Sequence, residues 1–202
     1  MSGNENGSGS RSGSDLLEGV PGTPGGSGGE PIQPERGRPR FPKGYGVPAT
    51  PDGLLEWRWV EERLERAKNY WICTTRPDGK PHARPIWGAW VDQSFFFDGG
   101  GRWSSYMGEN SQMTVHLESG DEVVIVEGHV ESVTTLEPAV FATVRAQYGS
   151  KYEYKPEAAQ GLYRVRPGLV FCWTKLDKDP TRFRFGRYRP SEKGLDEERD
   201  VR

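Results

Sequence analysis

Residues 70–103 read YWICTTRPDGKPHARPIWGAWVDQSFFFDGGGRW, and this stretch decides the fold. Residues 70–75 mix aromatic and β-branched side chains, which suit a half-buried strand. Pro77-Asp78-Gly79 follows, and Asp-Gly between two strands is a strong hairpin signal because glycine adopts positive φ. A second turn at Asp92-Gln93 leads to three consecutive phenylalanines. The stretch predicts three antiparallel strands that lead into the glycine run 99–101.

The two ends of the chain have compositions that do not build a core. Residues 1–30 contain ten Gly and six Ser, and residues 31–51 add six Pro. Such segments bury too little apolar surface to offset the entropy of ordering them. We therefore expect a disordered Gly/Ser/Pro-rich tail over 1–51, one folded domain over 52–188, and a charged, disordered tail over 189–202.

The composition of the whole chain argues against several classes of protein. The formal net charge is −2 and the pI is near 6, so no global basic field favours nucleic acid. No apolar run is long enough to span a bilayer, and the N-terminus has no secretion-type apolar segment. The two cysteines, Cys73 and Cys172, lack metal-type spacing and fit a reducing compartment. We expect a cytoplasmic protein that binds neither nucleic acid nor membrane.

Two longer helices are predicted in the domain. The first is expected over about 53–68, with Asp52 as its N-terminal cap, because apolar residues recur there at helical spacing. The second is expected over about 136–148, where Thr134 and Glu137 have the spacing of a capping box. Pro138 is tolerated at its start because the first-turn amides have no helical partner.

The remaining strands complete the predicted sheet. They are expected over 112–117, 123–126, 161–166 and 168–174, and Pro167-Gly168 is interpreted as the turn between the last two. Near the C-terminus, arginines alternate with Phe183 and Phe185, which indicates a charged strand or coil with its aromatic side chains packed on the domain. Several short strands with few helices predict a closed β-barrel, since closure removes edge strands.

The common catalytic motifs do not occur in the sequence. There is no G-x-S-x-G elbow and no Walker-type loop, and the spacing of the histidines fits no metal site. Glu118, Asp121 and Glu122 are clustered, but in a predicted hairpin turn where solvated acids are the rule. We therefore predict no catalytic side chain and no metal ligand.

The glycine run is the best candidate for an anion site. Gly99–Gly101 would let the backbone approach a ligand, and a short helix expected over 102–109 would present free N–H groups. Arg102 and Ser104 add a bidentate donor and a hydroxyl, which suit a phosphate. A flexible loop that caps a helix is the alternative. Arg84 could converge on the same place, or be an ordinary surface arginine.

The order and spacing of these elements resemble the pyridoxamine-phosphate-oxidase-like split-barrel flavoproteins. The likeness is carried by HARPIWGAWVDQSFFFDGG (82–100), GRW (101–103) and MTVHLESGDEVVIVEGHVE (113–131), and it spans about residues 54–185. It implies a mainly β fold with short helices, a split β-barrel of about six antiparallel strands. It also implies a homodimer with FMN or the deazaflavin coenzyme F-420 at the interface.

The resemblance implies a set of cofactor-binding residues. The family's strand arginine falls on Arg84, its phosphate motif on residues 101–103, and the strand that approaches the ring edge on residues 122–124. Arg84, Arg102 and Ser104 would bind the phosphate or acidic tail of the cofactor. Trp87, Phe96, Phe97 and Trp103 would surround its ring. The full set is Arg84, Pro85, Ile86, Trp87, Phe96, Phe97, Gly101, Arg102, Trp103 and Ser104.

Two positions depart from the FMN-binding pattern. Lysines that help to neutralise the phosphate are replaced by Trp103 and Ala89, which removes two charge-assisted hydrogen bonds. Trp103 would instead stack on a ring or pack against the barrel wall. This sequence therefore fits the deazaflavin-binding or other branches at least as well as the FMN branch. The family's C-terminal substrate segment has no counterpart after Trp173, so a true vitamin B6 oxidase is not expected.

We predict a flavin- or deazaflavin-dependent oxidoreductase that acts on a small-molecule substrate. Two alternatives stay open from the sequence. One is a non-catalytic protein that holds a flavin, haem or other planar ligand on the same barrel. The other is a protein–protein module that uses exposed aromatic side chains.

Overall fold

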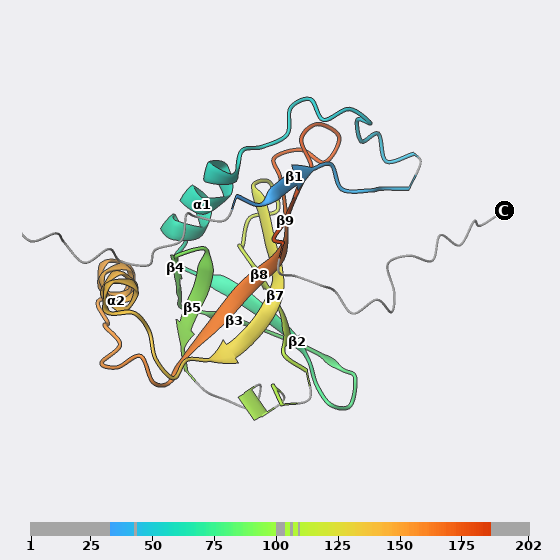
Figure 1. Cartoon of the computed structure of the whole chain (residues 1–202). Helices are drawn as coiled ribbons and strands as arrows, with labels where there is room; N and C mark the ends of the chain where they lie inside the picture. Colours follow the sequence, from blue (N-terminus) through green and yellow to red (C-terminus); the bar gives the residue numbers. More distant parts are fainter. Residues whose placement is uncertain (1–32, 43, 100–103, 106, 109, 187–202) are drawn as a thin grey trace, which may run out of the picture. The chain divides into compact units, whose positions relative to one another are not determined.

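The structure is a computed structural model that describes residues 33–42, 44–99, 104–105, 107–108 and 110–186 (Figure 1). These residues belong to one compact unit. None of the helices described is long and apolar enough to cross a membrane. In chain order the elements are β1 (Glu35–Gly37), α1 (Trp57–Arg66), β2 (Tyr70–Thr75), β3 (Pro81–Ile86), β4 (Ala89–Val91), β5 (Ser94–Asp98), β6 (Gln112–His116), β7 (Val123–Ser132), α2 (Pro138–Tyr152), β8 (Leu162–Trp173) and β9 (Thr181–Arg184).

Antiparallel pairing joins the strands into one branched sheet. The main path runs β1-β9-β8-β7-β6-β2-β3, and β5 links β4 to β8 off this path. β8 is central because its first half pairs with β5, its second half with β9, and nearly all of it with β7. The mainly β, split-barrel prediction is confirmed. The predicted closure and strand number are wrong, because the sheet has nine strands and its ladder does not return on itself within the described residues.

The two predicted hairpin turns are confirmed. Gly79 has φ of 78°, and the turn is held by hydrogen bonds from Arg76 N to Lys80 O and from Gly79 N to Arg76 O, both 2.9 Å. In the second turn Asp92 and Gln93 have φ of 49° and 52°. Positive φ at both central residues gives a turn whose twist matches that of the strands it joins. The middle strand is interrupted at residues 87–88, which separates β3 from β4.

The strand pair predicted at the C-terminal end is one continuous strand. β8 passes through Pro167-Gly168 without a turn, and the ladder absorbs the irregularity as a register shift opposite Glu127 and Gly128 of β7. A bulge of this kind leaves one residue outside the ladder and bends the strand. The carbonyl of Gly168 instead accepts a hydrogen bond from Phe185 N at 2.9 Å. The bulge therefore turns part of β8 toward the segment that follows β9.

Part of the segment predicted to be a disordered tail is a strand. β1 pairs with β9, so that Glu35 is opposite Arg184 and Gly37 is opposite Arg182. Arg38 continues this attachment by donating hydrogen bonds to four carbonyls, those of Thr50, Asp52, Lys178 and Pro180. The predicted boundary at residue 52 is therefore wrong. The reason is that a partner strand nearly 150 residues later satisfies the backbone of β1.

Both helices are present, but their predicted caps are wrong. The residue before α1 is Glu56, and neither it nor Asp52 caps the helix with a side chain. Leu55 N donates instead to Thr181 Oγ1 at 2.9 Å, which holds the preceding chain along β9. The residue before α2 is Glu137, also without a side-chain cap. Pro138 does occupy the first turn of α2, as predicted.

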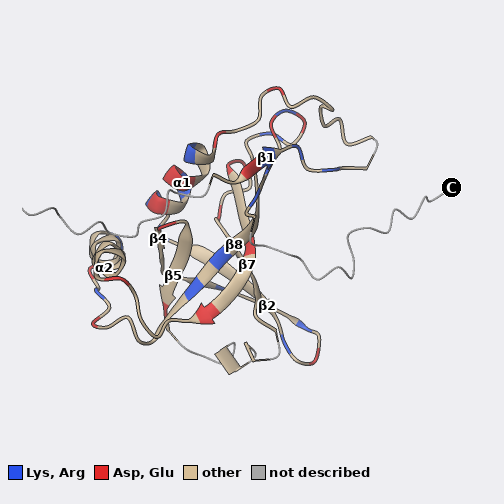
Figure 2. Cartoon of the chain, viewed as in Figure 1, with Lys and Arg blue, Asp and Glu red and all other residues tan. Residues whose placement is uncertain are grey.

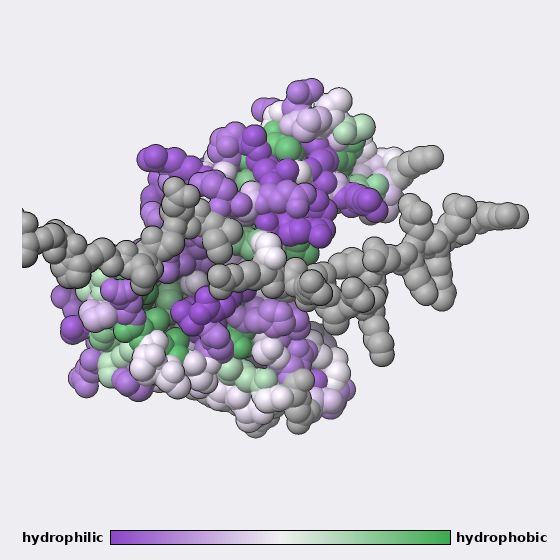
Figure 3. All heavy atoms as spheres, in the orientation of Figure 1, coloured by the Kyte–Doolittle hydropathy of each residue, from purple (hydrophilic) through white to green (hydrophobic). Residues whose placement is uncertain are grey.

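The three consecutive phenylalanines of β5 pack on both faces of the strand. Phe95 and Phe97 belong to the main core inside the sheet, whereas Phe96 belongs to a second core under α2. This alternation follows from the two-residue period of a strand. Both faces of β5 are therefore buried. Hydrophobic surface remains around α2 (green in Figure 3), where Val140 and Phe141 are only partly buried.

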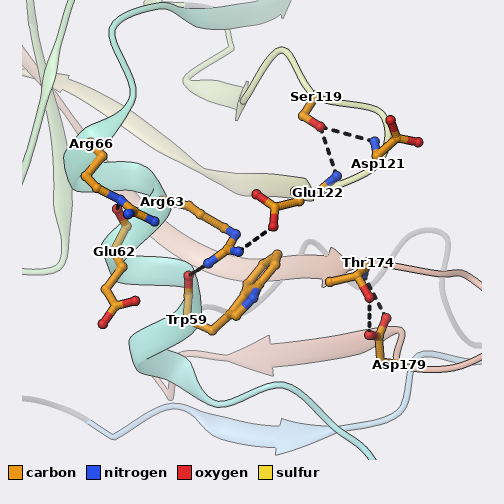
Figure 4. Close-up of polar contacts among 9 residues, drawn as sticks. All are labelled: Trp59, Glu62, Arg63, Arg66, Ser119, Asp121, Glu122, Thr174 and Asp179. Atoms are coloured by element: carbon orange, nitrogen blue, oxygen red, sulfur yellow. Dashed lines mark hydrogen bonds and ion pairs between the residues drawn. The ribbon is translucent and has the colours of Figure 1, made fainter.

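Asp179 closes the loop between β8 and β9. Its carboxylate accepts hydrogen bonds from Thr174 N at 2.8 Å and Lys175 N at 3.0 Å, and from the Thr174 hydroxyl (Figure 4). Burial alone would raise the pKa of Asp179, but these hydrogen bonds outweigh it and hold the pKa below its ordinary value. The loop is therefore organised around an ionised side chain, and it delivers β9 to the edge of β8.

Candidate functional site

Arg84 lies on the inner face of the hairpin formed by β2 and β3. It is opposite Ile72 in the ladder, and directly opposite residues of an antiparallel pair share a face. Ile72 is fully buried in the main core, and Arg84 itself is half-buried. Arg84 therefore stands at the border of the core, and its role in binding a phosphate stays a prediction.

Three polar atoms near the turn of this hairpin are buried without a partner. They are Thr74 Oγ1, His82 Nδ1 and Arg76 Nε, and none finds a hydrogen bond within the described part of the chain. Thr74 is opposite His82 in the ladder, on the same face as Arg84. A buried polar atom without a hydrogen bond is costly, so each one needs an explanation. A polar ligand that enters from this end would satisfy them.

A cavity opens beside these atoms, where β2 and β6 separate. The two strands pair only from Trp71 opposite His116 to Cys73 opposite Thr114. Beyond Cys73 they diverge and enclose about 280 Å³, close to the lower limit of small-molecule sites. We call this the splay cavity. Its lining residues are Cys73, Thr74, Thr75, Pro81, Gln112, Met113, Thr114 and Glu127.

The splay cavity has one acidic wall. Burial raises the pKa of Glu127, which shifts the carboxyl toward its neutral form. Burial also raises the pKa of the Cys73 thiol, so a reactive thiolate is not favoured there. The cavity therefore offers hydroxyl, amide and carboxyl groups for hydrogen bonding rather than a nucleophile.

Most of the glycine run lies outside the described residues. This applies to the predicted phosphate motif Gly101, Arg102 and Trp103, and to much of the helix predicted over 102–109. Gly99, at the end of β5, has φ of 111°, a conformation that favours glycine. Ser104 is half-buried in a short helical turn with Ser105. The roles assigned to residues 101–104 stay predictions.

The remaining predicted residues are spread over different surroundings. Phe96 and Phe97 are 1% and 0% exposed, so they can shape a ligand site only through backbone atoms or from behind other side chains. Ile86 is buried and Pro85 is exposed. Trp87 is 51% exposed and stacks on Tyr152 of α2, with ring centroids 4.7 Å apart. Arg84 thus faces the core from the middle of β3, whereas Trp87 follows the end of the strand and is directed toward α2.

The sequence interpretation missed the contribution of α2 to this strand end. Tyr148 Oη donates to Trp87 O at 3.1 Å, and Gly88 N donates to Tyr152 Oη at 3.0 Å. Gly88 is required here, because a Cβ atom would lie 2.2 Å from the ring of Phe95. The two tyrosines are four residues apart on one helix face, which is the only signal that the sequence offered.

The arginines of β8 are not a free anion site. Figure 2 shows basic bands on β8 beside the acidic end of β7. Arg164 Nε and Arg166 Nε donate to Glu131 Oε1 at 2.6 and 2.9 Å. Burial would raise the pKa of Glu131, but the hydrogen bonds from Arg166 and Arg164 lower it below its ordinary value. Glu131 therefore pairs with both arginines and balances one of their two positive charges.

The acidic cluster at the turn between β6 and β7 has a structural role. Arg63 of α1 donates from Nη2 to Glu122 Oε1 at 2.6 Å and lies 3.5 Å from the centroid of the Trp59 ring (Figure 4). Asp121 N and Glu122 N both donate to Ser119 Oγ. Glu122, which the resemblance brings near the ring edge, therefore faces α1. In the described ranges no group of three or more His, Cys, Asp or Glu side chains could hold a metal ion.

Comparison with known proteins rests on structure rather than sequence. No family model matches the sequence, and no curated protein matches it. Among solved structures, a conserved hypothetical protein of Mycobacterium tuberculosis matches with a TM-score of 0.51 and 19% identity, over 63% of this chain and 88% of that chain. A FAD-binding protein of Mesorhizobium loti has a TM-score of 0.45 and 18% identity, over 64% and 95% of the two chains. A Listeria innocua protein, provisionally named a pyridoxamine 5'-phosphate oxidase, has a TM-score of 0.45 and 11% identity, over 56% and 94%.

The match to the Mycobacterium tuberculosis protein shows that the two chains share a fold over most of the described domain. At these identities the likeness concerns the fold alone, and one fold carries many activities. What this split barrel does must therefore be argued from its own residues. The unpaired polar atoms beside Arg84 and the adjoining splay cavity are the features that call for a ligand.

Proposed function

We propose that this split barrel is a flavin- or deazaflavin-dependent oxidoreductase of small molecules. One observation carries the proposal: Thr74 Oγ1 and His82 Nδ1 are buried without partners on the same face as Arg84, and Arg76 Nε is buried without a partner at the adjoining turn. Guanidinium groups are strong donors to phosphate, and hydroxyl and imidazole groups can complete its hydrogen bonds. The residues present therefore fit the phosphate or acidic tail of such a cofactor. Two free cysteines fit a reducing cytoplasm.

The chain's own part in the reaction is binding, orientation and the exclusion of water. A bound flavin or deazaflavin supplies the hydride or electron transfer. Arg84, with Arg102 and Ser104 from the glycine run, would hold the anionic end. Pro85, Ile86 and Trp87 would lie along the ring, with Trp103 and the backbone at Phe96 and Phe97 nearby. No nucleophile or metal is required in this scheme.

The choice between the two cofactors depends on missing lysines. Ala89 stands where the FMN pattern has a cation, and its side chain is fully buried in the core under α2. A buried methyl group gives a phosphate dianion no charge-assisted bond. The deazaflavin is therefore at least as good a candidate as FMN. The substrate would enter beside the ring, and we assign the splay cavity, which is lined by Thr74, to it.

The proposed enzyme works as a homodimer, with the cofactor between two chains. Trp71, His116, Ile125 and Phe171 stand opposite one another across β2, β6, β7 and β8. They form a row on the sheet face away from the core, and each is only half-buried in the single chain. A row of large side chains that spans four strands suits a partner surface.

Light scattering is expected to give twice the chain mass of 22.7 kDa. Burial of the half-exposed row at the interface is the physical reason. Ile125→Arg, in the middle of the row, should shift the protein toward the single-chain mass, whereas Ile125→Val should not. A wild-type protein that stays monomeric at all accessible concentrations would contradict the interface and with it the shared cofactor site.

Titration of FMN and of coenzyme F-420, each followed by visible absorbance, tests the cofactor proposal. Wild-type protein is expected to bind at least one of them with micromolar affinity or better. Arg84→Ala should weaken that binding by about 10- to 100-fold, because a hydrogen bond to a charged group contributes roughly 1.5–3 kcal/mol. Arg102→Ala should act in the same direction. Arg58→Ala is the matched control, since Arg58 is exposed on α1 and pairs with Glu62.

The outcomes separate the proposal from its rival. Binding followed by reduction with a coupled donor supports the oxidoreductase. Retention of flavin or haem without turnover supports the alternative, a non-catalytic holder of a planar ligand on the same barrel. If neither cofactor binds and both arginine variants behave as wild type, the proposed function is wrong.

A further inference from the structure

A second pocket, distinct from the splay cavity, lies between α2 and the start of β4. It encloses about 290 Å³ and is lined by Lys68, Asn69, Trp87, Lys151, Tyr152 and Glu153. We call it the α2 pocket. It shares no lining residue with the splay cavity. Its volume is close to the lower limit of small-molecule sites, so it suits a ligand of one or two rings.

One wall of the α2 pocket is a rigid aromatic shelf. The rings of Trp87 and Tyr152 are nearly parallel, at 5°, with centroids 4.7 Å apart. Tyr152 Oη donates to Lys68 O at 2.6 Å and accepts from Gly88 N at 3.0 Å. Tyr148 Oη donates to the Trp87 carbonyl. Trp87 is nonetheless 51% exposed, so the shelf is held in place while much of the indole is open to a ligand.

The second wall carries a half-buried cation, Lys151, that donates its hydrogen bonds to neutral groups. Lys151 Nζ donates to Tyr70 Oη at 2.9 Å and lies 3.5 Å from Gly88 O, and neither partner is charged. Within the described residues Lys151 makes no ion pair. An ammonium taken out of water without a counter-charge is unfavourable. Burial accordingly lowers the pKa of Lys151 to about 8, against a smaller raising effect of Glu65.

The remaining lining residues define the charge of a suitable ligand. Lys68 and Lys151 contribute two positive charges and Glu153 one negative charge, which leaves one net positive charge. A monoanion balances this charge, whereas a dianion would be repelled by Glu153. Asn69 adds an amide that can donate to a carboxylate oxygen.

We propose that the α2 pocket binds a small aromatic carboxylate, whose ring stacks on Trp87 and whose carboxylate pairs with Lys151. The shelf supplies the contact area, since stacked aromatic pairs are favourable beyond the area they bury. The ammonium supplies the charge-assisted bond, and it has three donors for two neutral partners. The site needs neither Arg84 nor the glycine run, and Trp87 is the residue that it shares with the proposed cofactor site.

Calorimetric titration with 2-naphthoate and with the neutral alcohol 2-naphthylmethanol tests this inference on the full-length protein. At pH 7 the carboxylate is expected to bind at least tenfold more tightly than the alcohol. Between pH 7 and pH 9 its affinity should fall about tenfold, because Lys151 loses its proton around a pKa of about 8. Tyr70 and Tyr152 keep their protons in this range, since burial raises the pKa of both. Affinity for the alcohol should not change.

Variants complete the test. Lys151→Met should remove the preference for the carboxylate, and Trp87→Ala should weaken both probes. Lys80→Met is the matched control, because Lys80 is exposed at the β2–β3 turn and pairs with Asp78. The pH comparison uses wild-type protein and therefore stands even if Lys151→Met does not fold. Equal affinity for the two probes at pH 7, no fall in affinity by pH 9, or an equal loss in Lys80→Met would each overturn the inference.

Discussion

Replacement of Trp57 by alanine is expected to lower the free energy of unfolding by about 3–5 kcal/mol. Trp57 opens α1 and is 7% exposed. Its ring centroid lies 5.1 Å from that of Phe183, 5.2 Å from that of Phe185 and 6.2 Å from that of Trp90, all in edge-to-face arrangements. One side chain thus joins α1, β4, β9 and the segment after β9. Removal of the indole leaves a cavity between these four segments, and they cannot all move inward at once to fill it.

Denaturant unfolding followed by circular dichroism measures this loss, and the slope of the transition should be unchanged. Trp57→Phe keeps one ring in the same place and should cost less than half as much. Tyr45→Ala is the control for loss of an exposed aromatic ring, because Tyr45 is 57% exposed, and it should change stability by no more than about 0.5 kcal/mol. A Trp57→Ala loss below about 1 kcal/mol would mean that this cluster does not hold α1 to the sheet.

Local turn chemistry explains which parts of the sheet could be predicted from the sequence. Asp78-Gly79 and Asp92-Gln93 determine their turns within four or five residues, and both hairpins are found where they were expected. Pro167-Gly168 carries an equally strong turn signal but lies inside β8. There the pairing of β8 with β7 outweighs the local preference of Pro-Gly for a turn. Gly168 has no opposite residue in the ladder and forms a bulge.

Long-range pairing explains what could not be predicted. β1 has three residues in a Pro- and Gly-rich segment, and nothing in that segment indicates a strand. It becomes one because β9 presents an open edge, and β9 is itself held by Phe183 in the core. The predicted cap of α1 is wrong for the same reason, because the chain before the helix is held by a hydrogen bond from Leu55 N to Thr181 Oγ1 rather than by a local side-chain cap.

The residues of the candidate site also differ in whether local sequence or long-range packing makes them recognisable. Arg84 could be chosen from the sequence because a strand arginine after a hairpin is a local feature. The unpaired atoms of Thr74 and His82 could not, because they become notable only when the two strands pair and the core covers them. Lys151 and Tyr152 lie on a helix some 65 residues after Trp87, and only the packing of α2 brings them to it.

Replacement of Gly128 by alanine is expected to destabilise the protein by about 3 kcal/mol, the upper part of the usual range for overpacking. Gly128 lies on β7 at the bulge. A Cβ atom there would be 2.1 Å from Arg166 O, 2.9 Å from Arg166 C and 3.2 Å from Pro167 Cα. All three atoms are backbone, so no side-chain rotation relieves the overlap. Strands β7 and β8 must move apart at the centre of the sheet.

Gly120→Ala is the matched control, because Gly120 lies in the turn between β6 and β7 and a Cβ atom there meets nothing within 4 Å. It should leave the unfolding transition within about 0.5 kcal/mol of wild type. A Gly128→Ala protein as stable as wild type would show that the bulge tolerates separation of its strands. The effect should also reach the splay cavity, since Glu127 is next in the chain and forms one of its walls. Any cofactor bound near Arg84 should therefore bind more weakly in Gly128→Ala than in Gly120→Ala, even in the fraction of protein that is folded.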